Sequence, residues 1–163
     1  MNEPRGLAAL VDGYLRLPRW LRALAPIAGM SILWWSSSRT PGDEPASVAR
    51  ALAHNAMHIV AYAGLAAAFW LLLSPRPAGR IVPWRSRAAW LLAVAYGVVD
   101  ELHQSQVPGR DCSFVDVCSD ACGAGIAVIA LRAIAGGFVI WRLPVLLLSF
   151  AGVASVCLAT FAG

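Results

Sequence analysis

Long apolar runs separated by short polar stretches dominate this chain of 163 residues. Three of the runs extend for about 18 residues or more with few or no charges, the length at which a helix crosses a bilayer. The full pattern predicts five membrane spans, and most of the prolines lie between them, where a helix would be interrupted. The spans are expected at residues 20–38, 56–73, 87–104, 114–135 and 139–161.

The segment before the first span has a different pattern. Over residues 7–17 the apolar side chains recur at helical spacing, with Asp12 and Arg16 off that stripe. The stripe consists of Leu7, Leu10, Val11 and Tyr14. Pro18 then ends the periodicity. We therefore expect a short amphipathic helix lying in the membrane interface.

Composition supports a membrane protein and excludes several other classes. The chain is 59% hydrophobic and 13% charged, with a mean hydropathy of +0.65, whereas a soluble domain carries about 25% charged residues. This excludes a soluble globular enzyme, a disordered regulator and a disulfide-stapled secreted domain. The four cysteines lack the paired spacing of a zinc site. We expect an all-α polytopic bundle that forms a single integral membrane domain over residues 1–163.

The net charge of +4 comes from 13 basic residues, all of them arginine. They are scattered between apolar runs rather than aligned along one face, so they predict a topological role and no nucleic-acid binding. Ten of them fall on one side of the predicted spans and three, Arg39, Arg50 and Arg110, on the other. By the positive-inside rule, the N-terminus is expected in the cytoplasm and the C-terminus outside.

Under this topology, four span ends bring polar groups to the outer membrane face. These groups are Ser36, Ser37, Ser38 and Arg39; His54, Asn55 and His58; Asp100, Glu101, His103 and Gln104; and Arg110, Ser113, Asp116 and Asp120. A carboxylate inside a span costs about 2.5–3.5 kcal/mol and is tolerated only when it faces the bundle or a water-filled cavity. The pattern therefore predicts an outward-open polar pocket lined by the first four spans.

Helical spacing adds detail to this pocket. Asp116, Asp120 and Gly123 share one face of their span at positions i, i+4 and i+7. His58 and Tyr62 share a face of theirs. Small residues around Gly123 indicate a face on which two helices pack closely.

The candidate catalytic residues are His58, Glu101, Asp116 and Asp100. His58 next to a carboxylate suits a general acid or base, although a hydrogen-bonded interfacial histidine is the alternative. Asp100 and Glu101 oppose the dipole at the C-terminal end of a helix, so local structure alone does not favour them there.

The candidate ligand-binding residues are Arg110, Gln104, Ser113, Arg39, Tyr62 and Asp120. Arg110 follows a Val-Pro-Gly turn, and its fork of donors suits a phosphate or carboxylate, while an internal ion pair with Glu101 or Asp116 is an equal alternative. His54, His58, Glu101 and Asp116 would allow a mixed nitrogen and oxygen metal site. No HExxH-like spacing supports one, so we expect no cofactor, with a divalent metal as the alternative.

Two segments resemble a known family. They are MHIVAY at residues 57–62 and YGVVDELHQSQVPGRDCSFVDVCSDACGAGIA at residues 96–127. Both are similar to the VanZ-like membrane proteins, which are named for a teicoplanin-resistance protein. The resemblance covers about residues 28–130 and leaves an additional C-terminal span. It implies a role in the cell envelope, in the inner (cytoplasmic) membrane of a bacterium, without specifying a reaction.

This chain departs from the family pattern at two positions. Asn55 stands where the family usually has lysine, and Asp120 stands where it often has asparagine. Both changes make the pocket more acidic than the resemblance implies.

Three functions fit these observations. The first is an enzyme, a hydrolase or transferase acting on an envelope lipid head group, for which the resemblance implies a link to teicoplanin-type resistance. The second is a non-catalytic protein that binds or shields a lipid-linked cell-wall intermediate or a lipoglycopeptide. A small transporter ranks last, because the polar groups lie on one side of the membrane. The oligomeric state is left open.

Overall fold

The structure is a computed structural model, which describes residues 3–40, 47–75, 83–110, 112–136 and 142–161. These residues form six helices and no strand, so the all-α prediction is confirmed. The helices are α1 (Glu3–Leu15), α2 (Arg19–Ser37), α3 (Val48–Leu73), α4 (Pro83–Gln104), α5 (Phe114–Gly136) and α6 (Arg142–Phe161).

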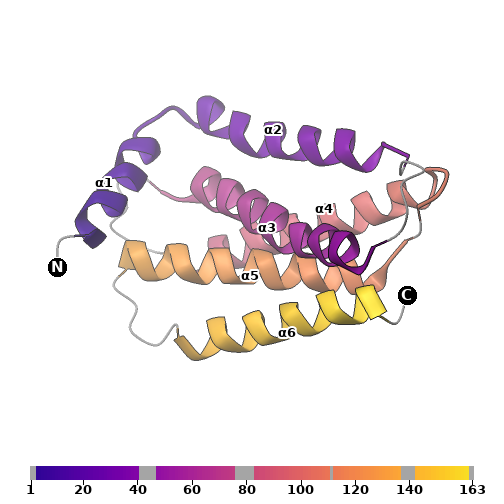
Figure 1. Ribbon diagram of the computed structural model, residues 1–163. Helices are drawn as coiled ribbons and strands as arrows, with labels where there is room; N and C mark the ends of the chain where they lie inside the picture. The colour runs from indigo at the N-terminus through magenta and orange to yellow at the C-terminus, as the bar shows by residue number, and fades with distance from the viewer. Residues whose placement is uncertain (1–2, 41–46, 76–82, 111, 137–141, 162–163) are drawn as a thin grey trace.

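The helices α2 to α6 run lengthwise beside one another and alternate in direction along the chain (Figure 1). The helix α3 is central and contacts α2, α4, α5 and α6. The helix α1 lies at one end of the bundle, where Val11 and Leu15 pack against the core and Leu10 is exposed. This is the position expected of an interfacial helix.

The predicted spans match α2, α4 and α5 closely. The helix α3 includes the span expected at 56–73 and the polar helical lead-in that the sequence predicts from Ser47. Ser47 caps this helix by accepting a hydrogen bond from the backbone N–H of Arg50 at 3.3 Å. The first residues of the fifth predicted span, 139–141, lie outside the described residues. Among the described helices, α3, α5 and α6 are long and apolar enough to cross a membrane. The helices α2 and α4 are also long, with 19 and 22 residues, but more polar.

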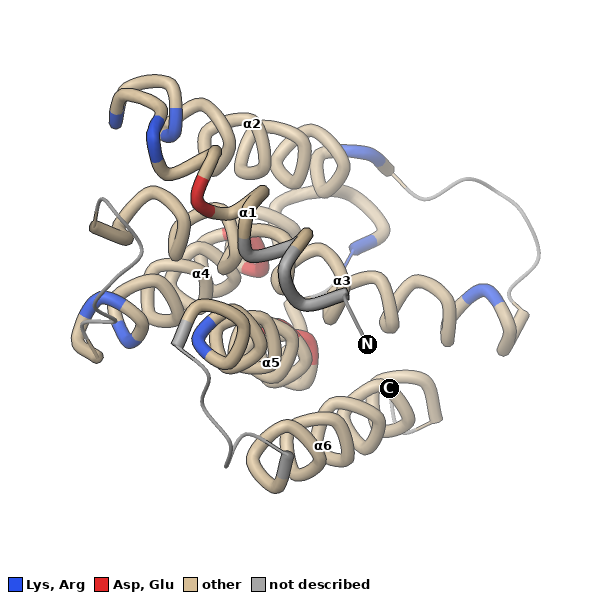
Figure 2. Tube along the Cα trace, turned by 90° about the vertical axis from the view of Figure 1, so that its left-hand side faces the viewer, with Lys and Arg blue, Asp and Glu red and all other residues tan. Residues whose placement is uncertain are grey.

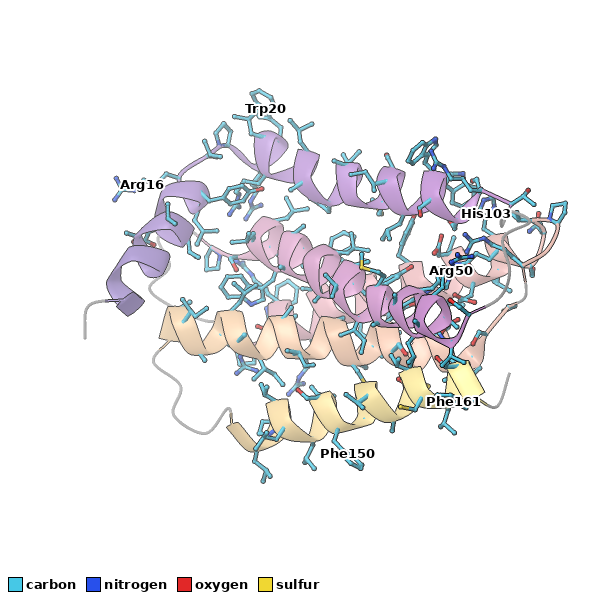
Figure 3. All side chains as sticks on the ribbon, in the orientation of Figure 1. Arg16, Trp20, Arg50, His103, Phe150 and Phe161 are labelled. Atoms are coloured by element: carbon cyan, nitrogen blue, oxygen red, sulfur yellow. The ribbon has the colours of Figure 1, made fainter. Side chains whose placement is uncertain are left out.

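Apolar and charged side chains are distributed between the surface and the interior of the bundle as a lipid environment requires. Large apolar side chains cover the outside: Phe150 is 77% exposed and points away from the bundle (Figure 3). Inside, Glu101 is 2% exposed and Asp120 is completely buried. Apolar groups facing outward and carboxylates facing inward are unfavourable in water and favourable in a bilayer.

The arginines lie mainly near the helix ends, as Figure 2 shows from the end where α1 lies. Arg22 at this end is buried, and its Nη1 donates to the carbonyl oxygens of Leu71 at 2.9 Å and Ser74 at 3.1 Å. This arginine therefore ties the start of α2 to the end of α3.

The helices α3 and α5 pack backbone against backbone at Gly123. A Cβ atom at this position would lie 2.1 Å from the carbonyl oxygen of Ile59, so only glycine fits. The expected close-packing face is confirmed here. One turn before Gly123 on α5 is Asp120, and one residue before Ile59 is His58. The close approach therefore brings these two side chains together.

Candidate functional site

A cavity of about 310 Å³ lies between α2, α3 and α4, at the end of the bundle where α2 and α4 end. One part of its lining is polar and consists of Ser36, Ser37, His54, His58, Tyr62, Asp100, Gln104 and Arg110. The other part is apolar and consists of Ile32, Leu33, Met57 and Ala61. The volume is at the lower end of the range found for small-molecule sites.

Asp100 connects α4 to α2 at the edge of this cavity. Its Oδ1 accepts a hydrogen bond from Ser37 Oγ at 2.6 Å, and its Oδ2 accepts one from Gln104 Nε2 at 3.1 Å. Both carboxylate oxygens are thus engaged within the protein. Ser37 belongs to the serine group noted at the end of the first span, but only its contact with Asp100 reveals its function.

Glu101 connects α4 to the start of α5. Its Oε2 accepts from the backbone N–H of Ser113 at 2.8 Å, and its Oε1 accepts from Gln104 Nε2 at 3.3 Å. Ser113 in turn caps α5, because its Oγ accepts from the backbone N–H of Asp116 at 3.2 Å. Ser113 is therefore occupied as a helix cap and does not line the cavity.

His58 and Asp120 form a buried pair between α3 and α5. The distance from His58 Nδ1 to Asp120 Oδ1 is 3.0 Å. Tyr62 lies one turn along α3, with its ring parallel to that of His58 at a centroid separation of 6.3 Å. The Tyr62 hydroxyl and Asp120 Oδ2 are both buried without a hydrogen-bond partner among the described residues.

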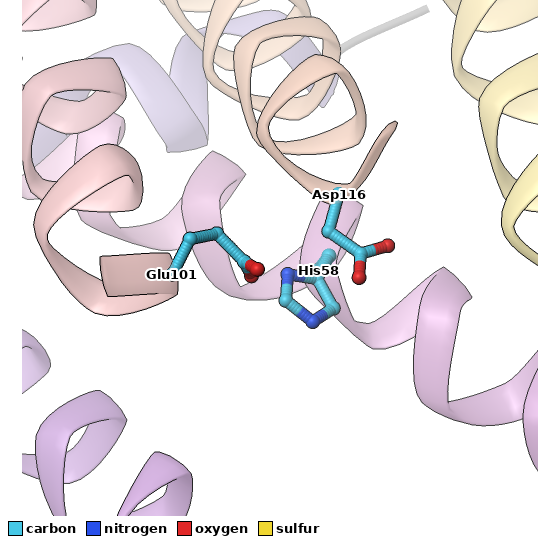
Figure 4. Close-up of side chains that lie close together, drawn as sticks. All are labelled: His58, Glu101 and Asp116. Carbon is cyan, nitrogen blue, oxygen red and sulfur yellow. The ribbon is translucent and has the colours of Figure 1, made fainter. Parts of the chain in front are cut away.

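His58, Glu101 and Asp116 form a compact cluster contributed by three helices (Figure 4). One ligand atom from each residue lies within 4.8 Å of the others. Asp116 Oδ1 is buried and has no hydrogen-bond partner among the described residues. The four residues expected to be catalytic are thus divided: three gather in this cluster, whereas Asp100 binds Ser37 and Gln104.

Arg110 is presented by a tight turn, as its sequence predicts. Its backbone N–H donates to the Val107 carbonyl at 3.1 Å, and Gly109 has a φ of 80°, which suits the third position of a type II turn. The Arg110 guanidinium donates through Nε to the Arg39 carbonyl at 3.0 Å and through Nη1 to Gln104 Oε1 at 3.1 Å. The alternative of an ion pair with Glu101 or Asp116 is not what the structure contains.

Arg39 does not bring its charge to the cavity. Its guanidinium lies over the Trp35 ring, 3.6 Å from the centroid, and the residue is exposed. Only its backbone carbonyl contributes, by holding Arg110.

Sequence reasoning missed the apolar wall of the cavity and the position of Asn55. Residues such as Met57 and Ile32 resemble lipid-facing residues in a span, and no local signal identifies them as a cavity wall. Asn55, next to the predicted pocket in sequence, is turned toward α6, where its Nδ2 donates to Thr160 Oγ1 at 2.9 Å.

These features define a helical membrane protein with a polar pocket between helices at one end of the bundle. The model of the VanZ/LLP1 family matches residues 16–136, and the chain belongs to this family. The match includes α2 to α5 and every residue predicted for the site, and α6 follows it. No curated protein and no solved structure matches the chain.

Proposed function

We propose that this VanZ-family protein binds an envelope lipid, with the polar head group at the Arg110 end of the cavity. The observation that carries this proposal is the divided lining of the cavity. Its polar part includes Arg110 and Gln104, and its apolar part includes Leu33 and Met57. A lipid or lipid-linked cell-wall intermediate has the same two-part chemistry.

Arg110 is the residue best suited to hold an anionic head group. Two of its donor nitrogens bind Gln104 and the Arg39 carbonyl, which fixes the guanidinium plane, and neither contact neutralises its charge. The remaining N–H groups stay available for a phosphate oxygen. The arginine distribution supports a pocket that faces outward, with the N-terminus in the cytoplasm of a bacterium.

A second candidate function is catalysis on the bound head group, and the His58–Asp120 pair favours it. His58 lines the cavity and is held by a buried carboxylate, an arrangement that suits a general base. In a hydrolase, His58 would take a proton from water while the water oxygen bonds to the head-group phosphorus. The bond to the leaving oxygen would break, and His58 would return the proton to that oxygen. In a transferase, an alcohol would replace the water.

Lipid binding and catalysis would both act on lipids at the outer side of the membrane. A role in teicoplanin-type resistance would follow if the bound lipid carries a cell-wall intermediate, or if the protein shields such a lipid from a lipoglycopeptide. Transport receives less support, because the groups that line the cavity come from one end of the bundle.

The test measures binding of fluorescent short-chain phosphatidylglycerol to the purified protein in detergent, with phosphatidylcholine and inorganic phosphate as competitors. Arg110→Ala should weaken binding by about 1.5–3 kcal/mol, the contribution of a hydrogen bond to a charged group, and Arg110→Lys should recover little of it. Arg39→Ala is the matched control, because the Arg39 guanidinium lies on Trp35 and outside the cavity. Equal affinity of Arg110→Ala and wild type would contradict the proposal.

Turnover distinguishes the two candidate functions. If the protein is an enzyme, His58→Gln should lower the rate of head-group release by about 10²–10⁴-fold while lipid affinity changes little. If the protein only binds lipid, wild type should release no head group, and the variants should differ from wild type only in lipid affinity.

A further inference from the structure

Two carboxylates and an imidazole meet beside the cavity, which His58 lines, and no described arginine forms an ion pair with either carboxylate. The ligand atoms of His58, Glu101 and Asp116 lie within 4.8 Å of one another. Arg110, the nearby cation, directs its hydrogen bonds to Gln104 and to the Arg39 carbonyl and not to either carboxylate. Two carboxylates so close together in a nearly dry environment repel each other and lose hydration.

The hydrogen bonds of the cluster leave coordination sites open. Glu101 is 2% exposed, and among the described residues it accepts from Ser113 and Gln104 alone, so each of its oxygens retains a lone pair. Asp116 Oδ1 is buried and has no hydrogen-bond partner among the described residues. A buried acceptor without a donor is unfavourable, and a bound cation would remove that cost.

A fourth residue supports the cluster from behind. Asp120 is completely buried, and its Oδ1 lies 3.0 Å from His58 Nδ1. Metal-bound histidines usually donate their second ring N–H to a carboxylate, which fixes the ring and increases its basicity. With Nδ1 engaged by Asp120, Nε2 is the nitrogen that keeps a lone pair for a ligand.

From these contacts we infer that His58, Glu101 and Asp116 bind a divalent transition-metal ion, with Asp120 as the positioning residue behind His58. One imidazole and two carboxylates suit Zn²⁺ or Mn²⁺, and Zn²⁺ is the tighter of the two in the usual affinity order. His58 also lines the cavity, so the metal would face the bound head group and act on its phosphate as a Lewis acid. In the metal-bound protein this Lewis-acid role would replace the general-base role of His58, because both ring nitrogens of His58 are then engaged. The Lewis-acid role rests on the proposed function, whereas metal binding itself does not.

The experiment titrates chelator-treated, detergent-purified full-length protein with Zn²⁺ alone, by calorimetry and by metal analysis after gel filtration. Wild type should bind about one Zn²⁺ per chain, and the Zn²⁺-bound protein should unfold at a higher temperature than the metal-free protein. Glu101→Gln and Asp116→Asn should each weaken Zn²⁺ binding by about 100-fold or more. Asp120→Asn should weaken it by about 10–100-fold, as loss of a residue that orients a metal ligand does.

Three variants separate this inference from folding and from lipid binding. His103→Gln removes a histidine that stacks on Trp34 outside the cluster, and it should leave Zn²⁺ binding unchanged. Asp116→Asn is the variant most certain to fold, because the wild-type carboxylate accepts no hydrogen bond from a described residue. Arg110→Ala should lose lipid and retain Zn²⁺. Failure of wild type to bind Zn²⁺ or Mn²⁺, or equal binding by Asp116→Asn, would overturn the metal site and leave the lipid proposal standing.

Discussion

The contact between Gly123 and the backbone of α3 positions the candidate site. A larger side chain at residue 123 would force α3 and α5 apart and should destabilise the whole bundle. In Gly123→Ala the new Cβ atom would lie 2.1 Å from the carbonyl oxygen of Ile59 and 2.8 Å from its Cα. Both neighbours are backbone atoms of a helix, so neither can rotate aside. The two helices must therefore separate.

The size of the effect follows from that distance. An ordinary non-bonded contact is about 3.5 Å, and the new Cβ atom would lie 2.1 Å from the Ile59 oxygen, so α3 and α5 would have to separate by roughly 1.4 Å at this point. Overpacking of a tight interior costs about 1–3 kcal/mol, and occasionally more when backbone must move. Alanine recovers up to about 1 kcal/mol through its higher helix propensity. We therefore expect the free energy of unfolding to fall by about 2 kcal/mol, with the His58–Asp120 pair disturbed because it lies beside the contact.

The assay is reversible denaturation of the purified protein in mixed micelles, followed by circular dichroism. Gly64→Ala is the matched control on α3, because nothing lies within 4 Å of the Cβ atom that it would add. This control should be neutral, or more stable by up to about 1 kcal/mol. If Gly123→Ala proves as stable as Gly64→Ala, the close approach of α3 and α5 is wrong, and so is the placement of Asp120 beside His58.

Two further predictions concern topology and the edge of the cavity. In a background without native cysteines, Gln106→Cys should react with an impermeant thiol reagent on intact cells. Labelling only after permeabilisation would reverse the topology. Gln106 is chosen because it is exposed, whereas the neighbouring turn residue Gly109 has a φ of 80° that disfavours a side chain. Ser37→Ala should lower the free energy of unfolding by about 1.5–3 kcal/mol, because the buried Asp100 carboxylate loses its 2.6 Å hydrogen bond. Exposed Ser31→Ala is its control, and equal stability of the two variants would refute this role of Ser37.

The sequence alone determined the helices and the end of the bundle at which the polar groups gather. In a bilayer every backbone polar group must be hydrogen-bonded within the chain, so an apolar run of sufficient length forms a helix whatever surrounds it. The segment before Pro18, the Val-Pro-Gly turn and the small-residue face at Gly123 are also local signals. Each depends on neighbours in sequence, and each was predicted from them.

The tertiary structure decided which polar groups meet. The sequence brought His58, Glu101 and Asp116 to the same membrane depth, but it did not distinguish their cluster from an ion pair of Arg110 with either acid. It also placed the Arg39 charge in the pocket, whereas the structure places that side chain on Trp35. Such pairings depend on how each helix is rotated and how closely it packs against the next. Those quantities follow from contacts between distant segments, such as Gly123 against Ile59, and no local pattern of residues contains them.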